Sequence, residues 1–166
     1  MLLLITLSVC CIINNVIGQS PGCGGSNCPS YSTCEKYTDY TLALQNWCNN
    51  GNWTIHGLWP NYDASCYPQY CHSPTWHDVT GSLYTSMMKY WNWCASSSGS
   101  QQSDWEHEWM RHGTCLEYYE GTSFDQTDFF NKGLSVYQTV LNDGTIREKC
   151  GTPSPNGSCE KLCLDL

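Results

Sequence analysis

Two segments in the first half of the chain have strand-like patterns. Tyr40, Leu42 and Leu44 alternate with the residues between them up to about Trp47, a period of two that is typical of a half-buried strand. Residues 53–60 are rich in β-branched and aromatic side chains until Pro60 ends the run. Because residues 49–51 (Asn-Asn-Gly) are turn formers, the pattern predicts two paired strands.

Helical spacing follows in three later segments. Apolar residues recur at steps of three and four from Val79 to Cys94, which predicts an amphipathic helix. Ser103 with Glu106 has the spacing of a capping box for a helix over about 104–113.

A similar signal, Ser123 with Gln126, precedes a third predicted helix that ends near residues 143–144, whereas residues 145–166 have little periodicity. The 166 residues contain no internal repeat or linker. We therefore expect one α+β domain, in which an antiparallel sheet packs against several helices and disulfides stabilise the fold.

The N-terminus and the cysteines favour export. Residues 1–13 are an apolar run too short to span a bilayer, and a short polar segment leads to Gly18. This predicts a signal peptide at 1–18 and a mature domain at 19–166, with a buried strand as the alternative. Thirteen Cys fit an oxidising compartment, and removal of Cys10 and Cys11 would leave an odd number. Two Asn-X-Ser/Thr sequons predict glycosylation at Asn52 and Asn156.

Charge restricts how such a protein could bind nucleic acid. The chain has seven Lys and Arg against fifteen Asp and Glu, a net charge of −8. Sequence-independent binding of a phosphate backbone needs a continuous basic surface. The acidic composition therefore excludes non-specific electrostatic binding of nucleic acid. Any chemistry on nucleic acid must therefore be local.

Residues 107–115 (His-Glu-Trp-Met-Arg-His-Gly-Thr-Cys) concentrate the scarce His and Arg. On an α-helix His107, Glu108, Arg111 and His112 fall within an arc of about 140°. The alternative is that these are ordinary solvent-exposed charges on a helix. Against it, the whole chain has only five His, and two of them lie in this segment. A cluster of titratable groups on one face favours a functional site.

Metal binding is a second alternative for this segment. A zinc-protease helix spaces its two His four residues apart, whereas His107 and His112 are five apart. We expect no metal and no other cofactor. Imidazoles can share acid and base roles while a cation and a carboxylate stabilise a phosphoryl transition state. His56, on the second predicted strand, is the natural partner for the helix.

Residues 53–60 (Trp-Thr-Ile-His-Gly-Leu-Trp-Pro) and 105–115 resemble the two active-site segments of the ribonuclease T2 family, in the usual order and at a comparable separation. The likeness covers about residues 40–141. It implies a secreted endoribonuclease that cleaves single-stranded RNA by metal-independent transesterification through a 2′,3′-cyclic phosphate. DNA would not be cleaved, because it lacks the attacking 2′-hydroxyl.

The resemblance also implies a role for each site residue. His112 would be the base that takes the 2′-hydroxyl proton, and His56 the acid that protonates the leaving 5′-oxygen. Glu108 and Arg111 would stabilise the pentacovalent phosphorane, and His107 would bind phosphate. Arg111 stands where the family more often has Lys, and its planar fork could hold phosphate bidentately.

Trp59 has two interpretations that the sequence leaves open, stacking on a base or packing in the core. The family's disulfide between the two motifs implies a Cys66–Cys115 bond here, while spacing alone suggests Cys34 with Cys48. Family members continue past this chain's end with further strands, so we expect a shortened C-terminal part, since residues 158–165 resemble only the start of that region.

The expected partner is single-stranded RNA, with no stable membrane association and a monomeric state. The alternative from another class is a secreted effector or binding glycoprotein on the same fold, with little or no catalysis. Its glycans would then mediate receptor binding.

Overall fold

The computed structural model describes residues 39–48, 50–61, 67–71, 73–94, 100–120 and 123–165. The signal peptide expected at 1–18 lies outside this part of the chain, as do Cys34 and Cys66. The elements, in chain order, are β1 (Asp39–Gln45), β2 (Thr54–Asn61), α1 (Gly81–Tyr90), α2 (Gln101–Glu108), the π-helical turn η1 (Trp109–Gly113), α3 (Thr114–Glu120), α4 (Gln126–Asn142), α5 (Thr145–Cys150) and β3 (Ser158–Asp165).

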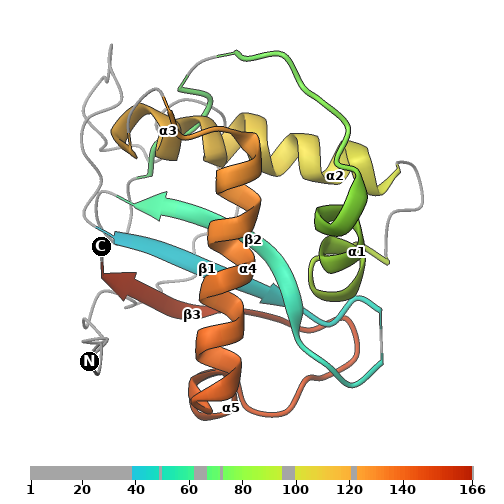
Figure 1. Cartoon of the computed structure of the whole chain (residues 1–166). Coiled ribbons are helices and arrows are strands. Elements are labelled where there is room, and N and C mark those ends of the chain that lie inside the picture. Colours follow the sequence, from blue (N-terminus) through green and yellow to red (C-terminus); the bar gives the residue numbers. More distant parts are fainter. Residues whose placement is uncertain are drawn as a thin grey trace.

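The strands form one antiparallel sheet in the order β2-β1-β3 (Figure 1). Leu42 of β1 pairs with Leu58 of β2 on one side and with Leu162 of β3 on the other. The α+β class and the pairing of the first two strands are thus confirmed. The sequence pattern does not predict β3, because its buried and exposed residues do not alternate regularly. Residues 162–164 are all buried, and the pairing with β1 shifts register between Leu42 and Leu44.

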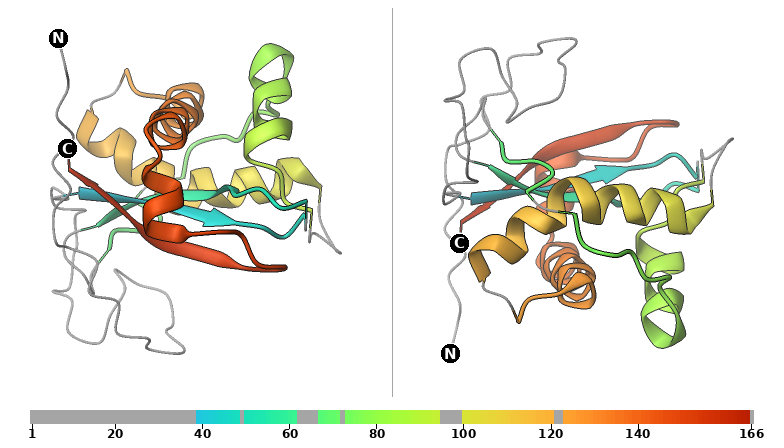
Figure 2. Two further views of the ribbon diagram at one scale, coloured as in Figure 1. Left: turned by 90° about the horizontal axis from the view of Figure 1, so that it is seen from below. Right: turned by 90° about the horizontal axis from the view of Figure 1, so that it is seen from above.

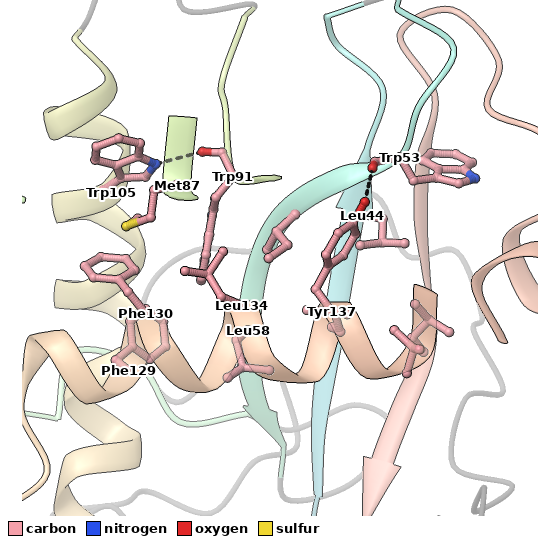
Figure 3. Close-up of a cluster of buried hydrophobic side chains, with 14 of the residues drawn as sticks. Leu44, Trp53, Leu58, Met87, Trp91, Trp105, Phe129, Phe130, Leu134 and Tyr137 are labelled. Atoms are coloured by element: carbon pink, nitrogen blue, oxygen red, sulfur yellow. Dashed lines mark hydrogen bonds between the residues drawn. The ribbon is translucent and has the colours of Figure 1, made fainter. Parts of the chain in front are cut away.

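Helices α1 and α4 lie on the same face of the sheet, with α4 crossing the strands (Figures 1 and 2). The apolar side of α4 packs into the core together with the indoles of Trp91 and Trp105 (Figure 3). Tyr137 of α4 donates a hydrogen bond of 2.6 Å to the carbonyl of Trp53, which fixes the helix to the start of β2. The buried residues of α4 are Phe129, Phe130, Gly133, Leu134, Tyr137 and Val140.

The three predicted helices exist, but their bounds differ from the prediction. The pattern from Val79 to Cys94 is helical only over α1, Gly81–Tyr90. Ser100, not Ser103, caps α2, because Ser103 is already inside the first turn and donates from Oγ to the Ser100 carbonyl. Asp125, not Ser123, caps α4 and forms a capping box with Asp128. A carboxylate at the positive end of a helix is a stronger acceptor than a hydroxyl.

The second predicted helix does not end at Gly113. It passes from α2 through the π-helical turn η1 into α3. A Cβ at Gly113 would collide with the rings of Trp109 and Phe129, so this glycine permits close packing rather than termination. None of the helices in the described ranges has the length and apolar content to cross a bilayer.

Three disulfides join described residues: Cys48–Cys94, Cys71–Cys115 and Cys150–Cys159. The expected Cys66–Cys115 and Cys34–Cys48 bonds are therefore wrong. Cys71 lies beside Cys115 because residues 70–71 run along η1 and the start of α3. The Tyr70 amide donates to the Arg111 carbonyl at 2.9 Å, and the Cys71 amide donates to Thr114 Oγ1 at 3.2 Å.

Candidate active site

A cavity of about 340 Å³ brings together the six residues expected at the site, which are His56, Trp59, His107, Glu108, Arg111 and His112. They come from β2, the end of α2 and the turn η1, which lie side by side. Asn61, Tyr67 and Glu160 complete the lining. Glu160 is on β3, so the unpredicted strand also reaches the site.

The His56 side chain, on β2, is surrounded by three Trp rings. Its ring lies 4.6 Å from Trp93, 5.2 Å from Trp47 and 5.3 Å from Trp59, each in an edge-on arrangement. The Trp91 indole donates a 2.8 Å hydrogen bond to the His56 carbonyl and anchors this part of the strand. The pKa of His56 is lowered to about 4, mainly by burial and in smaller part by the positive charges of His107 and Arg111.

Glu108, the last residue of α2, is almost completely buried. Its Oε2 accepts a 3.0 Å hydrogen bond from the Trp59 indole, and its Oε1 lies 3.9 Å from His56 Nε2. Burial raises the pKa of Glu108 to about 8, although the Trp59 bond and the Arg111 charge act against this shift. Gly57 leaves the space for the contact, since a Cβ there would collide with both Glu108 and Trp59.

The two pKa shifts describe the protonation of the His56–Glu108 pair. With pKa values of about 4 for His56 and about 8 for Glu108, both side chains are uncharged between these limits. The proton stays on the carboxyl group rather than on the imidazole. A neutral carboxyl group can donate a hydrogen bond to an anion, whereas a carboxylate would repel it.

His112 lies on η1, where the wider turn replaces α-helical geometry. Such π-helical insertions occur often at functional sites. The ring is buried and stacks on Trp59 with centroids 5.4 Å apart. Burial holds the pKa of His112 well below its usual value, assisted by the charge of Arg111. Nδ1 has no hydrogen-bond partner among the described residues, so the ring is held by packing.

Arg111 is the only Lys or Arg among the described residues that line the cavity. Its Nε donates a 3.1 Å hydrogen bond to Oε1 of Gln69, a nearly buried residue of the segment 67–71. No sequence pattern points to Gln69, because it carries no charge and lies in an aperiodic loop. The bond fixes the guanidinium at the cavity without neutralising it.

His107 is the most exposed of the three His residues at the cavity. Partial desolvation and the Arg111 charge lower its pKa. No group of three or more His, Cys, Asp or Glu in the described ranges is arranged to hold a metal ion. The expected glycosylation residues Asn52 and Asn156 are both exposed and line no part of this cavity.

The cavity therefore combines three imidazoles, a carboxyl group that burial keeps protonated below a pH of about 8, and a guanidinium held by Gln69. These groups suit the chemistry of a phosphodiester, in which one oxygen is deprotonated, another is protonated and the phosphoryl oxygens gain charge. Trp59 donates to Glu108 and stacks on His112, so it contacts the site residues directly.

Comparison with known proteins agrees with this chemistry. The chain is 43% identical to Ribonuclease 1 of Arabidopsis thaliana over 110 residues, which cover 65% of this chain and 45% of that protein. It is 39% identical to Extracellular ribonuclease LE of Solanum lycopersicum over 88 residues, covering 52% and 37% of the two chains. The chain spans about half the length, or less, of these curated relatives.

Solved structures show the same fold. The SF11-RNase associated with self-incompatibility in Nicotiana alata superposes with a TM-score of 0.55 at 21% identity, over 72% of this chain and 66% of that one. A mutant of RNase MC1, the bitter gourd seed ribonuclease, in complex with 5′-UMP has a TM-score of 0.52 at 23% identity over the same shares. The family model for ribonuclease T2 matches residues 25–160, and the chain belongs to the ribonuclease T2 family.

Proposed function

We propose that this chain is a secreted endoribonuclease that cleaves single-stranded RNA without a metal ion, through a 2′,3′-cyclic phosphate. The observation that carries the proposal is the convergence of His56, Glu108, Arg111 and His112 on one cavity. Family membership and the names of the relatives support the class of reaction. Three disulfides between described residues, together with the name of the relative from Solanum lycopersicum, support secretion.

In the proposed reaction His112 takes the proton from the 2′-hydroxyl, and the resulting oxygen attacks phosphorus. His56 donates a proton to the departing 5′-oxygen as that P–O bond breaks. Burial supports the role of His112 as base, because an imidazole with a low pKa is unprotonated even in mildly acidic solution. Arg111 and the protonated Glu108 bind the phosphoryl oxygens as charge accumulates on them.

His56 must carry a proton to act as the acid, although its pKa in the free protein is about 4. A phosphate group bound in the cavity places negative charge beside the imidazole and raises that pKa. The protonated form of His56 is therefore favoured in the complex with RNA and at acidic pH. His107, at the exposed side of the cavity, contributes to phosphate binding, and Trp59 positions Glu108 and His112.

The test is an RNA-cleavage assay that detects cyclic-phosphate products in the presence of EDTA. We expect His56→Ala and His112→Ala each to lower kcat/KM by at least about 100-fold, the usual contribution of a positioned acid or base. His77→Ala is the matched control, because His77 is exposed and lies outside the cavity. Full activity of either site variant would refute the assignment and favour the non-catalytic effector glycoprotein.

A further inference from the structure

A second cavity, of about 560 Å³, is larger than the active-site cavity and shares no lining residue with it. It is bordered by the segment between β1 and β2, the C-terminal ends of α1 and α4, and α5. Figure 1 shows α5 at the lower end of α4. The residues that decide its chemistry are Asn52, Lys89, Tyr90, Tyr137, Leu141 and Arg147. None of them is used by the proposed reaction.

The lining combines aromatic and apolar surface with hydrogen-bond donors. The rings of Tyr90 and Tyr137 lie 5.7 Å apart, and Leu141, which also lines the cavity, is 44% exposed. Lys89 and Arg147 supply donors, and the described lining contains no Asp or Glu. Such a surface suits a sugar ring, whose C–H face packs on aromatic groups while its hydroxyl and acetamido oxygens accept hydrogen bonds.

Asn52 identifies which sugar would occupy the cavity. It is exposed, it lies in the sequon Asn52-Trp-Thr54, and it forms part of the cavity lining. Among the described residues, its Nδ2 donates one hydrogen bond, of 3.3 Å, to the Asn50 carbonyl, which leaves the second amide hydrogen for substitution. We propose that the core N-acetylglucosamine residues of an N-linked glycan on Asn52 are seated in this cavity.

Attachment joins C1 of the first sugar to Asn52 Nδ2, with loss of one amide proton and of the diphosphate lipid carrier that delivers the glycan. Thr54, the hydroxyl residue of the sequon, is buried and donates to the Gln45 carbonyl at 3.2 Å. Attachment therefore precedes the pairing of β1 with β2. Because the tether keeps the sugar at high local concentration, weak contacts with Tyr90 and Leu141 are sufficient to seat it.

Asn156 provides a matched control within the same molecule. It lies in the other sequon, is exposed and has a positive φ of 53° before β3. It lines neither cavity. A glycan at Asn156 is therefore expected to project into solvent.

The experiment measures how fast a peptide N-glycosidase removes each glycan from the native, secreted protein, with site occupancy followed by mass spectrometry. We expect release from Asn52 to be about tenfold slower than from Asn156, the ratio that a seating free energy of about 1.4 kcal/mol would produce. In Leu141→Asp, the Asn52 rate should rise toward that of Asn156 while the Asn156 rate stays unchanged. In denatured protein the two rates should be equal.

Three results would overturn the proposal. They are an unoccupied Asn52, equal release rates at the two sites of native wild-type protein, and slow release from Asn52 that persists in Leu141→Asp. Leu141 is exposed, so its substitution is expected to leave the fold intact, and retained RNA cleavage verifies this. Cleavage is measured independently of glycan release, so failure of the proposed ribonuclease activity would not be confused with failure of this inference.

Discussion

His56 Nε2 and Glu108 Oε1 lie 3.9 Å apart, yet they do not form an ion pair across most of the physiological pH range. Burial is the largest cause of the pKa shift at both residues, and it favours the uncharged form of each. The same effect acts on His112. Single residues at this site therefore owe their protonation states mainly to desolvation.

The first residue-level prediction concerns pH. An active base must be unprotonated, and the low pKa of His112 meets this condition well below neutrality. An active acid must be protonated, and His56 loses its proton in the free protein as the pH rises through about 4. We expect kcat/KM for a dinucleotide to follow a bell-shaped curve with its maximum on the acidic side of neutrality. A maximum above pH 7 would contradict the assigned roles.

The second residue-level prediction concerns Gly57. A methyl group there would displace both Glu108 and the Trp59 indole, which are joined by a 3.0 Å hydrogen bond. We expect Gly57→Ala to reduce kcat/KM by about 100-fold, since small displacements of catalytic groups have effects of this size. Gly144→Asn is the control, because Gly144 has a positive φ and no neighbour within 4 Å. Equal activities of the two variants would show that Gly57 is not needed for the contact.

At the scale of elements, the segment 67–71 holds η1 and the start of α3 in three ways. Its amides bond to Arg111 and Thr114, Gln69 binds the Arg111 side chain, and Cys71 is bonded to Cys115. These links fix η1 from outside, in addition to its packing on the core. The position of Arg111 thus depends on a loop far away in the sequence.

Removal of this disulfide is expected to affect activity as well as stability. For the double variant Cys71→Ala/Cys115→Ala we expect a loss of roughly 2–5 kcal/mol in the free energy of unfolding. We also expect a raised KM for RNA, because Gln69 no longer orients Arg111. Cys150→Ala/Cys159→Ala removes instead the disulfide that joins α5 to β3, so a KM rise in that control would point to general destabilisation.

The elements also show what the sequence could predict. The strands around Leu42 and His56 and the helix bearing Phe130 were predictable, because local periodicity reports which side faces the core. Cys71, Gln69 and Glu160 reach the site through tertiary contacts that leave no local pattern. The π-helical turn was equally hidden, since it follows from how residues 109–113 pack rather than from their propensities.

At the scale of the molecule, β3 turns β1 from an edge strand into the centre of the sheet. Leu162 of β3 is fully buried in the core and pairs with Leu42. We expect Leu162→Ala to lower the free energy of unfolding by about 2–5 kcal/mol, measured in urea. Glu148→Ala, at an exposed position, is the control. A loss below about 1 kcal/mol would mean that β3 adds little to the fold.

The pairing of β1 with β3 also has a consequence for biosynthesis. More than 100 residues separate the two strands, so the sheet cannot be completed until residues 158–165 have been made. At ordinary rates of translation this interval lasts roughly 5–20 s. During that time one side of β1 has no partner strand and could pair with a neighbouring chain. Chaperones that bind extended nascent segments would therefore act on residues 39–45 first.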